Sequence, residues 1–280
     1  MLALLKRNFL LYFRNRSGVF FSLLGALISF ILYIIFLQKN LTDAWAQLPN
    51  SAPVLNNWLM SGTLAVTGIT TSLAALTQLV KDREHQVDQD LYLSDQGKWR
   101  LPFSYLTSAI IISFFMQALM YVLMCGYFRE VPALSLLPEV LHIMLLSSLL
   151  SSLVNAIFVY FFHSVDSLGK FSTIVGTASG FLVGTYVPLG VLPDFAQLLM
   201  KCTPATYIAA LYRQVLMKEA LNETFKGQDN LLQEFQEKMG VQLKWQALLT
   251  KEQTYLIVLG GILLALGIWI SLAKRSNKRK

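Results

Sequence analysis

Six long runs without Asp, Glu, Lys or Arg restrict the fold of this chain more than any other feature. They measure 21 to 37 residues, the shortest between Glu252 and Lys274 and the longest between Asp43 and Lys81. A helix that crosses the roughly 30 Å hydrocarbon core of a membrane needs about 20 apolar residues. It also satisfies its own backbone hydrogen bonds, which lipid cannot do. The runs therefore predict an all-α integral membrane protein with six transmembrane helices. We expect these helices at residues 17–37, 58–80, 104–127, 140–162, 170–187 and 254–272.

The composition argues against several classes of protein. Hydrophobic residues make up 55% of the chain and charged residues only 14%, whereas a globular domain carries about 25% charged residues. This argues against a soluble enzyme and a disordered protein, and two cysteines in 280 residues cannot form a disulfide framework. Cys125 and Cys202 both fall toward the outer side of the expected topology, which leaves a disulfide open. We favour two separate, buried thiols.

The distribution of Lys and Arg orients the helices. With both termini on the cytoplasmic side, 14 of the 23 basic residues lie in cytoplasmic segments, and the two short outer loops hold only Lys39 and Arg129. The other seven lie in the long stretch between the fifth and sixth helices, where the positive-inside rule is weak. The inverted orientation would place the basic C-terminal tail outside. We therefore expect cytoplasmic N and C termini.

The whole chain, residues 1–280, is expected to form a single membrane domain, with the first five helices within 17–187. Residues 1–16 precede them and place apolar side chains such as Leu2 and Phe9 near one helical face. This spacing favours an N-terminal helix that lies in the cytoplasmic interface, with its basic groups near anionic lipid head groups. A simple positive flank to the first span is the alternative.

The stretch 188–253 separates the fifth helix from the sixth. Pro188 and Pro193 prevent the fifth helix from continuing. The apolar pieces that follow are too short to span and too apolar for a fully solvated loop, which favours re-entrant or interfacial helices at the outer face. Residues 219–252 are more polar and indicate a small external helical segment. Residues 254–280 then supply the sixth helix and a basic cytoplasmic tail.

The segment from Lys81 to Arg100 is the most densely charged part of the sequence. Within it, Val87, Leu91 and Tyr92 are spaced to share one helical face. A short amphipathic helix on the cytoplasmic side is therefore expected. A solvated loop is an equally good reading of the same charge run.

The sequence contains no recognisable catalytic, metal-binding or nucleotide-binding motif. Gly169-Lys170 lacks the upstream glycine of a phosphate-binding loop, and the three histidines have no metal-ligand spacing. The expected helix interiors contain no Asp, Glu, Lys or Arg, which argues against a proton- or sodium-driven carrier. We therefore expect no catalytic residue, no metal and no cofactor bound by this chain.

Small polar residues do occur inside the expected helices, and they have two readings. They favour close helix–helix packing, which is the preferred reading, or they line a pathway for an amphipathic substrate. The candidates for such a lining are Thr67, Thr71, Ser148, Ser152, Asn155 and Thr177.

The proline-rich stretch after the fifth helix carries a recognisable pattern. It contains a proline, a second proline five residues on, then Pro-Ala-Thr-Tyr and a downstream arginine. The matching residues are Pro188, Pro193, Pro204, Thr206, Tyr207 and Arg213. Together with six helices and a charged loop after the second, this pattern resembles the membrane (permease) subunit of type-2 ATP-binding-cassette exporters. The resemblance implies that the segment 188–213 forms an outer gate.

The same resemblance implies a site of contact with an ATPase. Residues that resemble the ATPase-coupling loop of the family are Arg83, Glu84, Val87, Asp90 and Leu91. Two permease copies, or this chain and a related permease, would pair in the cell membrane, surrounded by lipid, above two separate ATPase subunits. ATP and Mg would bind to the partner ATPase, and closure of the ATPases would push on a helix at 82–93 and on the N-terminal helix. No nucleic-acid partner is expected.

Other functions remain open at this point. A secondary carrier or channel that works without ATP is the main alternative, and a non-transporting membrane sensor or immunity protein could share the same scaffold. An integral membrane enzyme acting on lipid would need clustered His, Asp or Glu at one membrane face. The sequence shows no such cluster.

Overall fold

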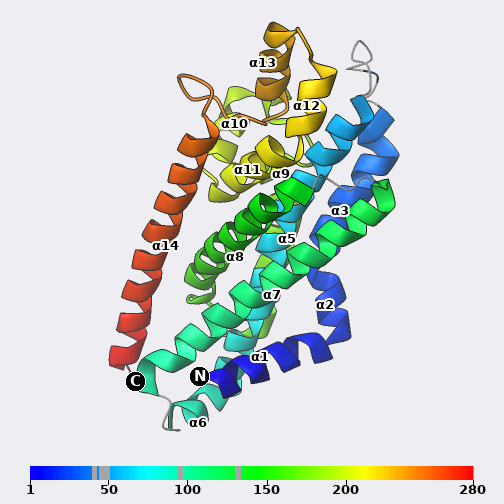
Figure 1. Cartoon of the computed structure of the whole chain (residues 1–280). Coiled ribbons are helices and arrows are strands. Elements are labelled where there is room, and N and C mark those ends of the chain that lie inside the picture. Colours follow the sequence, from blue (N-terminus) through cyan, green and yellow to red (C-terminus); the bar gives the residue numbers. More distant parts are fainter. Residues whose placement is uncertain (40–42, 44–50, 94–96, 130–133, 280) are drawn as a thin grey trace.

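The computed structural model describes residues 1–39, 43, 51–93, 97–129 and 134–279, and every named element in these ranges is helical (Figure 1). Within these ranges, four helices are long and apolar enough to cross a membrane. They are α5 (Ser51–Glu84), α7 (Gly97–Phe128), α8 (Leu137–Val159) and α14 (Lys251–Arg279). The expectation of an all-helical, multi-pass membrane protein is therefore confirmed.

The first expected span, 17–37, is not one straight helix. It is divided into α2 (Arg16–Ser22), α3 (Leu24–Leu32) and a π-helical turn, η1 (Tyr33–Leu37). The two parts are bent by 45° and count as a fifth candidate span if taken together. The Ser22 hydroxyl lies 2.7 Å from the carbonyl oxygen of Val19 and 2.8 Å from the Tyr12 hydroxyl. Such side-chain bonds to the backbone of the preceding turn often bend helices.

Helix α9 (Val165–Leu182) occupies the place of the expected fifth span, 170–187. It begins earlier because the Ser164 hydroxyl accepts a hydrogen bond from the backbone N–H of Ser167, 3.2 Å away, and so caps the helix. It is rich in Gly, Ser and Thr and includes Asp166 and Lys170, so it is less apolar than the four long helices. It is not among the candidate spans, and the count of six stays a prediction.

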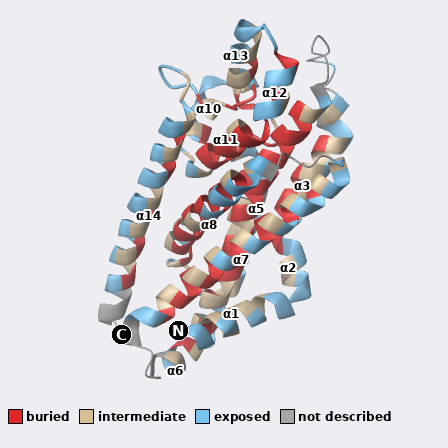
Figure 2. Ribbon diagram, in the orientation of Figure 1, coloured by how far each residue is buried: buried red, intermediate tan, exposed pale blue. Residues whose placement is uncertain are grey.

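Helix α5 packs against α7, α8 and α9, and Figure 2 shows that much of it is buried inside the bundle. In its most apolar part, 83% of the residues are buried, compared with 22% in α14. The outer side of α14 exposes leucines, including Leu256 and Leu263. An apolar exposed face suits contact with lipid, whereas the buried surface of α5 must be satisfied by other helices.

The two ends of the molecule differ in structure. The N terminus, the C terminus and the short helix α6 (Val87–Leu93) lie at one end, where α1 (Leu2–Arg14) runs across the bundle (Figure 1). We call this the basal end. A group of short helices lies at the opposite end. They are η3 (Leu189–Val191), α10 (Asp194–Lys201), α11 (Pro204–Leu216), α12 (Lys218–Thr224) and α13 (Asp229–Lys238).

Several local expectations can be judged directly. Of the segment 1–16, Leu2–Arg14 form the helix α1, while Arg16 already begins α2. The charged loop contains the helix α6, although residues 94–96 lie outside the described ranges. The single helix expected over 82–93 is wrong: α5 continues to Glu84, and Gln86 has φ 60°, a left-handed conformation that breaks the helix before α6.

The cysteine expectation is partly wrong. Neither Cys125 nor Cys202 is in a disulfide, so the preference for separate thiols agrees with the structure. However, neither thiol is fully buried, because Cys202 is exposed and Cys125 is half-buried. It follows α10 directly, at the point where the chain turns toward α11.

Candidate functional site

Asp82, near the end of α5, is the centre of a polar cluster at the basal end. Arg7 of α1 donates two hydrogen bonds to its carboxylate, Nη1 to Oδ2 at 2.7 Å and Nη2 to Oδ1 at 2.8 Å. Gln78 donates to Oδ1 at 2.7 Å, and the Tyr105 hydroxyl of α7 donates to Oδ2. Three helices therefore meet at one carboxylate.

The charges in this cluster compensate each other. Asp82 is only 3% exposed, and a buried carboxylate is costly unless it is paired and hydrogen-bonded. The hydrogen bond with Asp82 raises the pKa of the Arg7 guanidinium above its usual value. The fork of the guanidinium matches the two carboxylate oxygens, which makes the pair both strong and geometrically specific.

Arg83 and Glu84, the two residues after Asp82, bind to the connection between α8 and α9. Arg83 Nη1 donates to the carbonyl oxygens of Phe162, at 2.9 Å, and Tyr160, at 3.3 Å, just beyond the end of α8. Glu84 accepts a hydrogen bond at 3.0 Å from the backbone N–H of Val165, the first residue of α9. A cation beside terminal carbonyls and a carboxylate beside a helix N-terminus are both favourable with respect to the helix dipole.

The other expected ATPase-coupling residues lie on helix α6. Val87 and Leu91 are half-buried, and Leu91 packs against the apolar cluster at the basal end, whereas Asp90 is exposed. The predicted set is therefore split by the structure. Arg83 and Glu84 contact the α8–α9 connection within the chain, while Asp90 lies on the outer surface of α6.

At the opposite end, Arg213 of α11 is completely buried. It donates hydrogen bonds to the carbonyl oxygens of Gly184, at 2.8 Å, Val183, at 3.2 Å, and Gly240, at 3.1 Å. Both glycines have positive φ values, 71° and 64°, which suit glycine far better than other residues. Burial lowers the pKa of Arg213 to about 9, so the guanidinium remains charged at neutral pH.

The rest of the proline motif shapes the chain around Arg213. Pro188 and Pro193 stand directly before η3 and α10, and Pro204 is the first residue of α11, a position that proline favours because its N–H would be unbonded. The Thr206 hydroxyl lies 2.6 Å from the carbonyl oxygen of Met200. The motif therefore sets the turns that bring α10 and α11 together.

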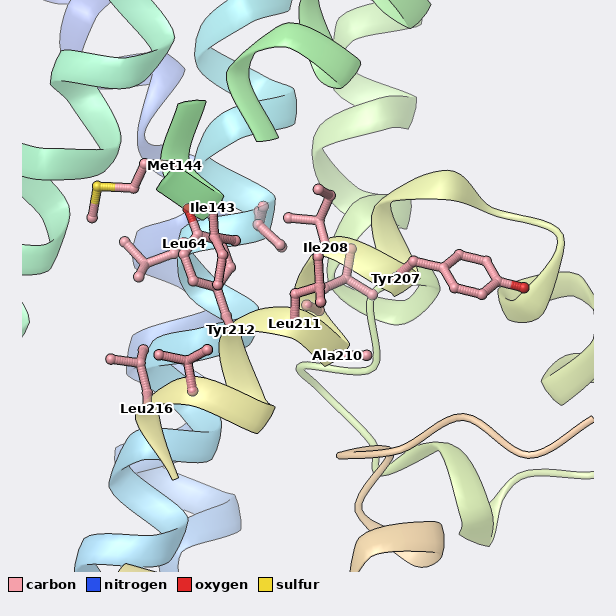
Figure 3. Close-up of a cluster of buried hydrophobic side chains, with 14 of the residues drawn as sticks. Leu64, Ile143, Met144, Tyr207, Ile208, Ala210, Leu211, Tyr212 and Leu216 are labelled. Atoms are coloured by element: carbon pink, nitrogen blue, oxygen red, sulfur yellow. The ribbon is translucent and has the colours of Figure 1, made fainter. Parts of the chain in front are cut away.

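Tyr207 and Tyr212 leave α11 on different sides. The Tyr207 hydroxyl donates to the carbonyl oxygen of Lys201 at 2.8 Å and accepts from the Trp245 indole at 3.1 Å. Figure 3 shows Tyr212 directed toward Leu64, while Tyr207 points away from that cluster. Helix α11 thus connects the group of short helices to the core of the bundle.

Most of the candidate pathway residues are buried between helices. Five of the six are less than 10% exposed: Thr67, Thr71, Ser148, Ser152 and Asn155. The Asn155 side chain donates to the Ser72 hydroxyl at 2.8 Å and thereby joins α8 to α5. These contacts support the helix-packing reading. Thr177 is the exception, because it is exposed on α9.

Thr177 lies in a groove between α2–α3, α5 and α9. Small and hydroxyl-bearing residues line this groove together with apolar ones, which are Phe21, Leu24, Ile28, Leu73 and Ala74. The small and polar members are Gly18, Ser22, Gly25, Thr70, Thr77, Gly169, Ser172, Thr173, Gly176 and Thr177. We call it the α9 groove.

Sequence reasoning missed Gln117, which is fully buried in the middle of α7. Its side chain donates to the Ser148 hydroxyl of α8 at 2.8 Å and accepts from the Tyr212 hydroxyl of α11 at 2.9 Å. The available signal was a lone glutamine inside an apolar run, because an amide in a membrane interior requires a partner. Sequence reasoning also missed Asp82 as a site residue, because its position in a charged stretch suggested a solvated loop.

Comparison with known proteins adds one finding. The profile of the ABC-2 type transporter family matches residues 1–217, which run from α1 through α11. Helices α12, α13 and α14 lie beyond the matched residues. No curated protein shows significant similarity to the chain. In the described ranges, no three His, Cys, Asp or Glu side chains are grouped so that they could hold a metal ion.

Proposed function

The chain belongs to the ABC-2 type transporter family, and we propose that it is the membrane-spanning subunit of an ATP-driven exporter with a separate ATPase subunit. The chain forms the substrate pathway, while ATP and Mg bind to the ATPase. The family match is the observation that carries this proposal. The absence of a phosphate-binding loop from the sequence supports the assignment of ATP binding to a separate subunit.

The proposed topology has six spans, with α2–α3 as the first and α9 as the fifth, in a single permease domain in the cell membrane. Both termini and α6 are cytoplasmic. Their common position at the basal end supports this arrangement (Figure 1), as does the concentration of Lys and Arg in the same segments. Helices α10 and α11 are re-entrant at the outer face, where the proline motif and Arg213 form the outer gate.

The proposed ATPase contact is α6. Its exposed Asp90 can meet a basic group of the partner, while half-buried Leu91 fixes α6 to the bundle. A push on α6 would reach α8 and α9 through Arg83 and Glu84, which hold the connection between those helices. This motion would switch the pathway between inward and outward access.

The α9 groove is the proposed contact with a second permease, either another copy of this chain or a related one. Exposed hydroxyls such as Thr173 and Thr177 gain little from facing lipid, whereas small residues and hydroxyls favour close helix–helix contact. A substrate path between two permeases would use the same face. An uncharged lining suits an apolar or amphipathic substrate.

Purification after mild detergent extraction tests the proposal. We expect an ATPase to elute with the chain, and reconstituted vesicles to transport only when ATP is supplied. Transport driven by an ion gradient in ATPase-free vesicles would instead identify a secondary carrier. Absence of both an ATPase and any transport would favour the sensor or immunity alternative.

A further inference from the structure

We propose that Asp82 is a positioning residue that fastens the N-terminal helix α1 to the end of α5, so that α1 and α6 move as one body. The inference rests on the proposed function, because it gives this body the task of passing movement from the ATPase to the bundle. Neither Asp82 nor Arg7 belongs to the set of residues that suggested the ATPase contact.

The hydrogen bonds of Asp82 use the full capacity of its carboxylate. Oδ1 accepts from Arg7 Nη2 and Gln78, and Oδ2 accepts from Arg7 Nη1 and Tyr105. A carboxylate has about four acceptor positions, so each is occupied. The donors come from α1, α5 and α7. A small displacement of any one of these helices therefore breaks a charge-assisted bond at a site that is only 3% exposed.

Helix α1 has few buried residues, and the pair adds a charged contact to the apolar packing of Phe9 and to the hydrogen bond between Tyr12 and Ser22. Only Leu4 and Asn8 of its thirteen residues are buried, and the Asn8 hydrogen bond to the Ser108 hydroxyl is long, at 3.4 Å. The Arg7 side chain is 29% exposed, compared with 4% for Asp82. The pair is therefore buried on the α5 side and accessible on the α1 side.

The sequence places this contact close to the proposed ATPase surface. Asp82 precedes the turn at Gln86 by four residues, and α6 begins directly after that turn. The next residues, Arg83 and Glu84, hold α8 and α9. The last turn of α5 is thus joined to α1 and α7 on one side and to the α8–α9 connection on the other. Without the Asp82 bonds, movement of α6 would still reach α8 and α9 but would leave α1 behind.

Hydrogen exchange on the purified chain in lipid nanodiscs tests the fastening without an ATPase. We expect Asp82→Asn and Arg7→Gln to speed amide exchange in α1 by about tenfold or more, the size expected for the loss of a bidentate, charge-assisted pair. Arg7→Lys keeps the charge but cannot form both hydrogen bonds to the carboxylate, so its amide exchange rate in α1 should be intermediate. Glu234→Gln, which removes an exposed ion pair with Lys238 on α13, is the matched control and should leave α1 unchanged. Unchanged exchange in both Asp82→Asn and Arg7→Gln would overturn the fastening.

The complex with its ATPase tests the positioning role. We expect the transport-to-hydrolysis ratio to fall in Arg7→Gln, with partial recovery in Arg7→Lys because Lys keeps the charge. Arg7→Gln is the decisive variant because Arg7 is partly exposed and lies outside the bundle core. A loosened α1 with an unaltered transport-to-hydrolysis ratio would overturn the role. If the wild-type chain binds no ATPase, the proposed function fails, while the exchange measurement still decides whether Asp82 fastens α1.

Discussion

The guanidinium of Arg213 lies over the indole ring of Trp58, with its central carbon 5.1 Å from the ring centroid. Both side chains are fully buried, and the Trp58 indole donates a hydrogen bond of 2.7 Å to the carbonyl oxygen of Met239. The contact joins α11 to the end of α5 that lies opposite the basal end. Because Arg213 also binds the carbonyl oxygen of Gly240, the two residues connect the central helix with the segment after α13.

Replacing Arg213 with alanine should destabilise the protein strongly. The change leaves buried carbonyl groups without donors, which costs roughly 2–4 kcal/mol in the free energy of unfolding. Arg213→Lys keeps a charge but cannot reach three carbonyl groups with the same geometry, so it should be intermediate. Thermal unfolding in detergent measures the effect. Arg129→Ala, at an exposed position, serves as control, and an equal melting temperature for Arg213→Ala and Arg129→Ala would contradict the structural role.

Replacing Glu84 with alanine should separate ATP hydrolysis from transport. Glu84 is exposed, and its described contact is the cap on α9 through the N–H of Val165, so we expect the fold to survive. Loss of the cap removes one of the side-chain contacts between the end of α5 and the α8–α9 connection, and hydrolysis should continue with reduced transport. Both rates are measured in reconstituted vesicles. His85→Ala, at the exposed neighbour, should behave as wild type, and normal coupling in Glu84→Ala would reject the assigned role.

Replacing Gln117 with leucine should weaken the packing of α7 against α8 and α11. The Tyr212 hydroxyl and the Ser148 hydroxyl each lose a hydrogen-bond partner in a buried site, at a cost of about 1–3 kcal/mol. A double-mutant cycle with Tyr212→Phe measures the coupling between the two side chains. Additive effects of the two changes would show that the hydrogen bond contributes nothing. Leu119→Ala, on the exposed side of α7, controls for changes in that helix.

Cys202 provides a test of the topology. It is exposed and directly follows α10, which lies at the end opposite to both termini (Figure 1), so a membrane-impermeant maleimide should label it in intact cells. Cys202→Ser should abolish this labelling, and Cys125→Ser should retain it. Labelling of Cys202 only after the membrane is permeabilised would place α10 on the cytoplasmic side and reject the proposed orientation.

The sequence predicted the helices far better than the contacts between them. Runs without charge identify segments that must satisfy their own backbone groups, and the structure contains helices at each of the expected places. The family resemblance, drawn from the proline motif and Arg213, is confirmed by the match over residues 1–217. The bend after Ser22 was not predictable, because it depends on hydroxyl contacts with Val19 and Tyr12.

Buried polar residues were the least predictable part of the candidate site. Asp82 stands in the most charged stretch of the chain, where solvation is the usual outcome, and its main partner, Arg7, lies 75 positions away. Gln117 likewise meets Tyr212 only because α7 and α11 converge. Local spacing can indicate which face of a helix is polar, but tertiary packing decides whether a charge is solvated or paired.

Photo-crosslinking from α6 tests the central claim most directly. With a photoreactive amino acid in place of exposed Asp90, we predict a covalent adduct between the chain and an ATPase subunit, formed in intact membranes. The same group at Leu263, on the exposed apolar side of α14, should give no such adduct. Transport by a chain that forms no ATPase adduct at position 90 would contradict the account.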